Sequence, residues 1–306
     1  MSTKCCFIFP GQGSQYVGMG KDLYTTYPEV KEIYDKAETI LELPIKKLSF
    51  EGPETELRNT NITQPAILIH SVAVYEILKK KNISPALACG HSLGEYSALY
   101  SAGVLSFETA LKLVKRRGEL MFSEGLKKPG AMAAIIGLSD DIVIDLCKKS
   151  AGVVVPANFN APGQIVISGE PNAVKEVCGQ ATEKGALKAI MLPVSGAFHS
   201  PLLQESAESY KSFLKTFEFN PPIFPIIPNR TGTATSDLNQ IREALEGQLI
   251  SPVLWTKTIS DVKRLGFTNL IEAGPGKVLA GLVKRIASDL STITVGKTEE
   301  IEKLPG

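Results

Sequence analysis

The residues best suited to chemistry in this 306-residue chain lie in the run GHSLG at 90–94, which matches the pattern G-x-S-x-G. An apolar strand candidate, 86–89, precedes the run, and a helical pattern follows from Glu95. Glycines on both sides of a serine permit a sharp strand-to-helix turn with little room for larger side chains. The hydroxyl then lies at the start of a helix, where backbone N–H groups and the helix dipole stabilise an oxyanion. We predict that Ser92 is a nucleophile; an ordinary glycine-rich loop is the alternative.

A serine nucleophile needs a base, and the chain has three histidines. His91 is adjacent to Ser92 in the turn and is expected to point away from it. His70 lies within a largely apolar helical stretch, so we expect it to be a core or edge residue. By elimination His199, in the run SGAFHSP, is the candidate base.

The acid of a hydrolase triad has no clear candidate. In the chain order of α/β-hydrolases the acid lies between Ser92 and His199. The acids in the stretch before the histidine include Asp140, Asp141, Asp145 and Glu170. All four fall in a segment that has the pattern of a separate small domain. We therefore expect something other than a carboxylate to orient His199.

The elements that must position these residues follow an α/β pattern. The sequence predicts a strand at 5–9 and helices at 27–41, from Thr63 onward, from Glu95 and at 109–121, followed later by helices near 201–217 and 236–248 and the strand TNLIEAG. Between 131 and 195 the expected order is β-α-β-β-α-β, which is typical of a ferredoxin-like domain. The last dozen polar residues are expected to be frayed. The pattern indicates a small domain inserted into a larger one.

Composition excludes several classes of protein. Hydrophobic residues make up 43% and charged residues 21% of the chain, which is typical of a folded domain, and the formal net charge of +1 argues against a dedicated nucleic-acid binder. The five cysteines form no CxxC pair, so we expect free thiols in a cytoplasmic protein and no metal site. No run approaches the roughly 18 apolar residues of a membrane span.

Five motifs together resemble one family. FPGQGSQ at 9–15, GHSLGE at 90–95, RG at 117–118, GAFHS at 196–200 and EAGPGKVL at 272–279 resemble the malonyl-CoA:acyl carrier protein transacylases of bacterial and organellar fatty-acid synthesis. The resemblance covers about residues 1–287. It implies an α/β fold with an α/β-hydrolase-like large domain, 1–127 and 197–306, and an inserted small ferredoxin-like (βαββαβ) domain, 128–196.

The resemblance also implies the reaction and its partners. A malonyl group would pass from malonyl-CoA to an ester on Ser92 and then to the phosphopantetheine thiol of acyl carrier protein. Malonyl-CoA is a substrate, so no cofactor and no metal are expected. We expect a monomer that binds neither nucleic acid nor membrane.

Family roles carry over by position. Ser92 matches the nucleophile and His199 the general base, while the backbone N–H groups of Gln12 and Leu93 match the oxyanion hole. Arg117 matches the arginine that grips the free carboxylate of malonate, because a guanidinium fork binds a carboxylate through two parallel bonds. A solvated helix charge is the alternative for Arg117, and it suits the neighbouring Lys115 and Arg116 better.

Two further residues have implied roles. The main-chain carbonyl of Gln248 matches the group that accepts a hydrogen bond from the histidine, which would explain the missing acid. Phe198 resembles the malonyl-selecting version of its motif, because a bulky ring beside the histidine would crowd the α-methyl group of methylmalonyl.

Competing interpretations remain at this stage. A serine esterase or thioesterase shares the elbow and base but needs an acid and has no use for Arg117. A non-enzymatic docking module of a larger synthase would not need Ser92, His199 and Arg117 together. Neither GQGSQYVG nor GPGK completes a phosphate-loop pattern. Acidic carrier proteins would favour basic residues near the site, and the candidates are Lys115, Arg116, Lys127, Lys128, Lys284 and Arg285.

Overall fold

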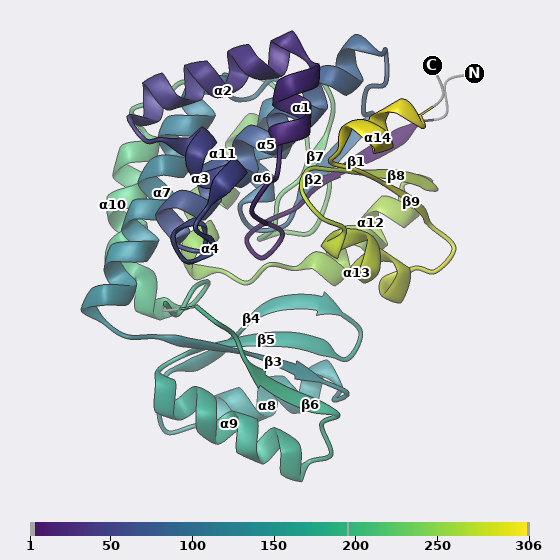
Figure 1. Cartoon of the computed structure of the whole chain (residues 1–306). Helices are drawn as coiled ribbons and strands as arrows, with labels where there is room; N and C mark the ends of the chain where they lie inside the picture. The colour runs from purple at the N-terminus through teal and green to yellow at the C-terminus, as the bar shows by residue number, and fades with distance from the viewer. Residues whose placement is uncertain (1–3, 195, 305–306) are drawn as a thin grey trace.

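The computed structural model describes residues 4–194 and 196–304 and contains two sheets (Figure 1). The larger sheet is parallel, with strand order β7-β2-β1-β8-β9. Its strands are β1 Cys5–Phe9, β2 Leu87–Gly90, β7 Ile226–Ile227, β8 Asn269–Ala273 and β9 Ser291–Val295. The apolar run of β1 fits its central place, because a parallel strand is covered on both faces.

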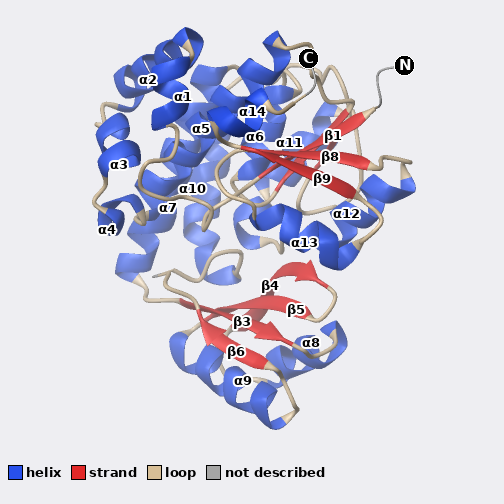
Figure 2. Ribbon diagram, turned by 45° about the vertical axis from the view of Figure 1, so that its right-hand side comes forward, coloured by secondary structure: helices blue, strands red, loops and turns tan. Residues whose placement is uncertain are grey.

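Successive side chains of β1 enter different cores, as the period-2 geometry of a strand requires. Phe7 and Phe9 pack in the larger core with residues of α2 Pro28–Leu41, α5 Thr60–Lys80 and α7 Phe107–Lys127. Cys6 and Ile8 pack on the opposite face with α12 Trp255–Arg264 and α13 Val278–Ile286. Helices thus cover both faces of the parallel sheet (Figure 2).

This part contains further helices and two 3₁₀ turns. They are α1 Lys21–Thr26, α3 Ile45–Glu51, α4 Glu54–Leu57, α6 Gly94–Ser101, α10 Gln204–Leu214, α11 Leu238–Glu246, α14 Thr298–Glu302 and the 3₁₀ turns η1 Pro201–Leu203 and η2 Gln248–Ile250. Among the described ranges, no helix combines the length and the apolar character needed to cross a membrane.

The second sheet is antiparallel, with strand order β4-β5-β3-β6. In chain order its elements are β3 Ala131–Ile136, α8 Asp140–Lys149, β4 Val154–Ala161, β5 Gln164–Gly169, α9 Pro171–Glu183 and β6 Lys188–Met191. The two helices cover the face away from the parallel sheet (Figure 1). Strand β4 joins the larger part through Val253, whose N–H donates to Ala157 O at 2.9 Å and whose carbonyl accepts from Phe159 N at 2.9 Å.

Several sequence expectations about element boundaries were wrong. Helix α5 begins at Thr60 rather than Thr63, and α7 extends from Phe107 to Lys127 rather than from 109 to 121. Up to residue 304 the polar end of the chain is not frayed: β9 adds a strand to the parallel sheet, and α14 buries Ile301 completely. The last two residues of that expectation lie outside the described residues. Tertiary packing holds this segment although its composition is that of a surface tail.

Candidate active site

Ser92 stands between the end of β2 and the start of α6 with a φ of 50°, in the left-handed region that few non-glycine residues adopt. The flanking glycines make this turn possible. A Cβ on Gly94 would collide with the carbonyl of Phe9, and one on Gly90 would collide with the backbone of Gly94. The strained turn therefore presents the Ser92 hydroxyl at a helix start, as the motif predicts.

His199 reaches the serine from the segment that follows the antiparallel sheet. Its Nε2 lies 2.8 Å from Ser92 Oγ. Its Nδ1 lies 3.0 Å from the main-chain oxygen of Gln248 and 3.1 Å from that of Ser251. Carbonyl oxygens only accept hydrogen bonds, so Nδ1 carries the proton and Nε2 is left to accept from the serine. The Gln248 carbonyl lies where the family match places it, whereas Ser251 was missed.

The environment of His199 favours its neutral form. The pKa of His199 is lowered to about 3, first by burial and then by the charge of Arg117, although the two carbonyl bonds act in the opposite direction. No carboxylate of the described residues forms a hydrogen bond with His199. A neutral imidazole with Nε2 facing a hydroxyl is the form that accepts a proton.

Arg117 is completely buried on α7 and points to the serine. Its Nη2 donates to Ser92 Oγ at 3.0 Å, and its Nη1 donates to Gln64 Oε1 at 2.8 Å. The oxygen of the Gln248 side chain accepts from both Nε, at 3.2 Å, and Nη2, at 3.0 Å. Gly118 lets α7 approach α5 this closely, because a Cβ there would lie 2.9 Å from Asn61 Cα. Arg117 is thus not a solvated helix charge.

Buried polar side chains form hydrogen bonds with the backbone of the turn at 90–94. The side chain of Asn229 accepts from Ser92 N at 2.6 Å and donates to Gly90 O at 2.6 Å. The side-chain amide of Gln248 donates to Ser92 O at 3.0 Å and to Glu95 Oε2 at 2.7 Å. Sequence reasoning missed Asn229, Glu95 and Gln64. The glutamate of GHSLGE was the one local signal available.

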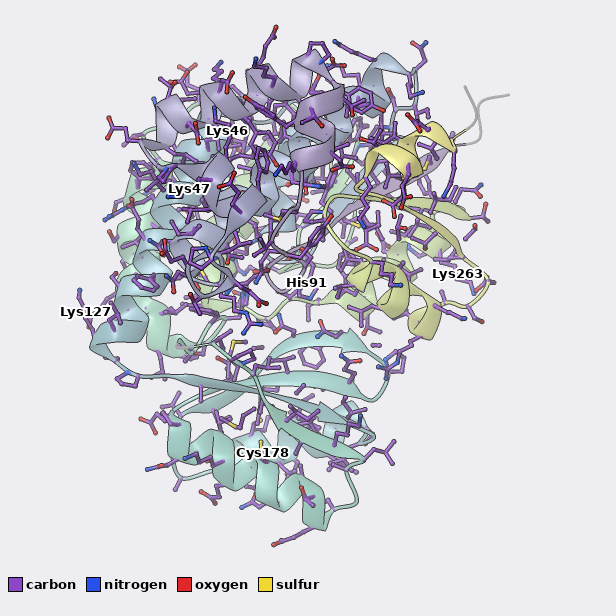
Figure 3. All side chains as sticks on the ribbon, viewed as in Figure 1. Lys46, Lys47, His91, Lys127, Cys178 and Lys263 are labelled. Carbon is purple, nitrogen blue, oxygen red and sulfur yellow. The ribbon has the colours of Figure 1, made fainter. Side chains whose placement is uncertain are left out.

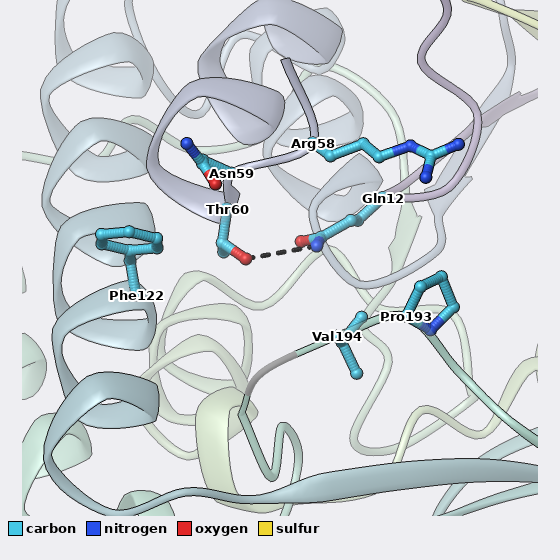
Figure 4. A pocket seen from close by; sticks show the side chains of 7 residues that line it. All are labelled: Gln12, Arg58, Asn59, Thr60, Phe122, Pro193 and Val194. Atoms are coloured by element: carbon cyan, nitrogen blue, oxygen red, sulfur yellow. Dashed lines mark hydrogen bonds between the residues drawn. The ribbon is translucent and has the colours of Figure 1, made fainter. Parts of the chain in front are cut away.

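The backbone N–H groups of Gln12 and Leu93 have no hydrogen-bond partner within the described ranges. The N–H of Ser92 itself is occupied by Asn229. Leu93 is the N-cap residue of α6, so its N–H belongs to the positive end of that helix. These two groups are therefore free to bind an oxyanion. The Gln12 side chain is held in place by a 3.2 Å bond from its Nε2 to Thr60 Oγ1 (Figure 4).

Two neighbouring pockets lie near the serine, and the smaller one is lined by it. A cavity of about 120 Å³ is lined by Gln12, His91, Ser92, Met121, Met132, Asn158, Leu192, Val194, Phe198 and His199. A more open pocket of about 350 Å³, drawn in Figure 4, is lined by Gln12, Arg58, Asn59, Thr60, Phe122, Pro193 and Val194. Gln12 and Val194 border both, so the two pockets lie next to each other.

Among the described residues, neither of the other histidines forms a side-chain hydrogen bond with Ser92 or His199. His91 lies between the two parts of the molecule (Figure 3), and its Nε2 is 2.8 Å from Asn160 Oδ1. His70 is completely buried within α5, and burial lowers the pKa of His70 to about 4. His70 is therefore a core residue, one of the two places expected for it.

Of the basic candidates, some have structural partners. Lys115 Nζ donates to Leu41 O at 2.8 Å, and Arg116 Nη2 donates to Ser209 Oγ at 3.2 Å. Lys128 pairs with Glu205 at 2.8 Å. Arg285 is hydrogen bonded to Gln164. Lys127 is exposed at the end of α7 (Figure 3), and Lys284 is exposed on α13.

Residues 6–298 match the family model described as the acyl transferase domain, and the chain belongs to this acyl transferase family. Its relatives include the malonyl CoA-acyl carrier protein transacylase of Bacillus subtilis, 44% identical over 303 residues, with 98% of this chain and 96% of the relative covered. The protein of that name from Escherichia coli K12 is 42% identical, with 94% of each chain covered.

Solved structures give the same picture. One is a type II PKS acyl-carrier protein in complex with its malonyl-transacylase, with a TM-score of 0.95, 41% identity and 98% of both chains covered. Another is an acyl carrier protein S-malonyltransferase from Vibrio cholerae, with a TM-score of 0.94 and 42% identity over 98% of this chain and 99% of that one. The mixed α/β fold with a parallel sheet is therefore that of known acyltransferases.

Proposed function

We propose that this chain transfers a malonyl group from malonyl-CoA to the phosphopantetheine thiol of acyl carrier protein, as in fatty-acid synthesis, through an ester on Ser92. One observation carries the proposal: Ser92 Oγ lies 2.8 Å from the neutral base His199 and 3.0 Å from the buried guanidinium of Arg117. The proposed base and the proposed carboxylate clamp thus both contact the hydroxyl of the proposed nucleophile.

In the first half-reaction Ser92 Oγ attacks the thioester carbonyl carbon while His199 Nε2 takes the hydroxyl proton. The carbonyl oxygen becomes an oxyanion and accepts bonds from the N–H groups of Gln12 and Leu93. Collapse breaks the carbon–sulfur bond, and His199 returns the proton to the coenzyme A thiolate. In the second half-reaction the carrier thiol gives its proton to His199 and attacks the ester. Ser92 leaves and regains the proton.

Arg117 selects the acyl group. The malonyl carboxylate can replace Ser92 Oγ as the acceptor of Arg117 Nη2 and add a second, parallel bond. Gln64 and Gln248 keep the guanidinium in place, so little freedom is lost on binding. Acetyl-CoA has no carboxylate and gains nothing from the clamp. Phe198, which borders the cavity, is proposed to crowd the methyl branch of methylmalonyl.

The larger pocket of Figure 4 is proposed to take the pantetheine arm of both substrates, because both arms must bring sulfur to Ser92. We also propose that residues 128–196 form a ferredoxin-like insert in an α/β-hydrolase-like domain made by 1–127 and 197–306. The order and pairing of β3 to β6 support this assignment. We propose no metal or cofactor, since His199 can supply the proton transfer. The monomeric state and cytoplasmic location stay predictions.

Intact-protein mass spectrometry tests the proposal. After incubation with malonyl-CoA the wild-type mass should rise by one malonyl group, and Ser92→Ala should show no increase. A stoichiometric label on Ser92→Ala would mean that another nucleophile is in use. Addition of carrier protein should then move the label to the carrier. Release to water without transfer would favour a thioesterase.

A further inference from the structure

We propose that Glu95 is a positioning residue that, through Gln248 and Asn229, fixes the Arg117 guanidinium and the Ser92 peptide for malonyl loading. The inference rests on the proposed function, since it concerns the same site. Glu95 lies in the first turn of α6 and is 1% exposed. It touches no reacting atom, so its effect must pass through the residues it holds.

The first path runs through the side chain of Gln248. Arg117 has only donors, so the Gln248 atom facing it must be the amide oxygen. The amide nitrogen then faces Glu95 Oε2 at 2.7 Å. A carboxylate oxygen in this place therefore sets which way the amide points. With the amide reversed, two donors of Arg117 would meet an NH₂ group and the clamp would lose its anchor.

The second path runs through the segment that follows β7. Glu95 Oε2 also accepts from the backbone N–H of Asn229 at 3.1 Å. That residue's side chain binds both the carbonyl before the turn, on Gly90, and the N–H of Ser92. Gln248 Nε2 donates to Ser92 O at 3.0 Å. The N–H and the carbonyl of Ser92 are thus both hydrogen bonded to residues that are themselves hydrogen bonded to Glu95.

The carboxyl group uses only one of its oxygens for this purpose. Oε1 is buried and has no partner among the residues the structure describes. Burial raises the pKa of Glu95 to about 7, against the bonds from Gln248 and Asn229 and the charge of Arg117, which lower it. A proton on Oε1 leaves Oε2 free to accept both bonds. The essential property is thus an acceptor at this point rather than a negative charge.

Two substitutions separate these properties. Glu95→Met keeps an unbranched side chain of similar length but removes the acceptor. Glu95→Gln keeps an oxygen that can accept from both N–H groups and removes the charge. The measurement is kcat/KM for loading of Ser92 from malonyl-CoA and from acetyl-CoA. Loading is monitored by quenched flow and intact-protein mass spectrometry. The matched control is Glu272→Met. Glu272 is another buried acid, but its oxygens accept backbone N–H groups of α13, at 3.0 and 2.7 Å, rather than groups bonded to Ser92 or Arg117.

Glu95→Met should lower malonyl loading by roughly ten- to a hundredfold, the usual effect of leaving buried donors unpaired. Acetyl loading should fall less, so the ratio of kcat/KM for malonyl loading to that for acetyl loading should fall. Glu95→Gln should restore both the rate and the ratio to within about threefold. Glu272→Met should lower the melting temperature and leave the ratio unchanged.

The inference would be overturned if Glu95→Met lowered kcat/KM for malonyl and acetyl loading equally, and by as much as Glu272→Met does. It would also be overturned if Glu95→Gln were as impaired as Glu95→Met. If Glu95→Met does not fold, Gln248→Met tests the first path and should lower the malonyl-to-acetyl ratio; an unchanged ratio would overturn it. A wild-type protein that malonyl-CoA does not load would instead refute the proposed function. The two failures are therefore distinguishable.

Discussion

Replacement of Arg117 by alanine should reverse the acyl preference of the enzyme. The guanidinium is completely buried and donates four hydrogen bonds, of which only the one to Ser92 Oγ points into the site. In the variant, the malonyl carboxylate would enter a water-poor cavity with no cation to meet it. Acetyl-CoA carries no such group and has nothing to lose.

The size of the effect follows from the burial of the pair. Truncating one partner of a buried, hydrogen-bonded charge pair costs about 2–5 kcal/mol. At about 1.4 kcal/mol per factor of ten, malonyl loading should fall by roughly 30- to 5,000-fold. Acetyl loading loses only the contact with Ser92 Oγ, a neutral acceptor, and should change by about tenfold or less. Acetyl should then compete with malonyl.

The assay is competitive loading from an equimolar mixture of the two acyl-CoAs, with the products on Ser92 resolved by mass. Arg117→Lys is the matched control, because it keeps the charge but not the fork that Gln64 and Gln248 hold. The malonyl-to-acetyl ratio of Arg117→Lys should lie between those of the wild type and Arg117→Ala. A malonyl preference in Arg117→Ala equal to that of the wild type would refute the clamp.

Three further outcomes are expected. His199 accepts a proton only when neutral, and its pKa of about 3 keeps it neutral well below pH 6.5. The loading rate should therefore not decline as the pH falls through the ordinary histidine pKa, and a half-maximal rate near pH 6.5 would contradict this. Gly118→Ala should push α7 from α5 and cost about 1–3 kcal/mol in urea unfolding, with a reduced malonyl preference. Charge reversal at Lys127 and Lys284 should slow transfer to carrier protein at low salt and spare loading, unlike the distant control Lys184→Glu; equal loss in both half-reactions would exclude docking.

How far the sequence leads depends on how local the determinant is. The turn around Ser92 depends on adjacent glycines, so its geometry is predictable from a few residues. His199 followed by elimination, because few histidines were available. Strand β9 and helix α14 were missed because polar and charged residues are frequent in this segment. Only the fold shows that β9 pairs with β8 and that Ile301 of α14 is buried.

The polar residues that bond to the Ser92 turn and to Arg117 could not be predicted from the sequence either, because they come from distant parts of the chain. Asn229 lies 137 residues from Ser92 in the chain, and Gln64 lies 53 residues from Arg117. Amide side chains are common on surfaces, so nothing in their type distinguishes a buried one. Ser251 acts through its main chain, and a carbonyl group is the same at every position. Such residues become visible only when the fold brings them together.

The use of main-chain carbonyls to orient His199 has a consequence for how the enzyme can evolve. A carboxylate in this place could be deleted by a single base change, whereas no side-chain replacement at position 251 removes its carbonyl oxygen. Gln248 contributes its carbonyl to the histidine and its amide to Arg117, so a substitution there alters the clamp and leaves the base oriented. The orientation of His199 is therefore protected from substitution in a way that the side-chain contacts of Arg117 are not.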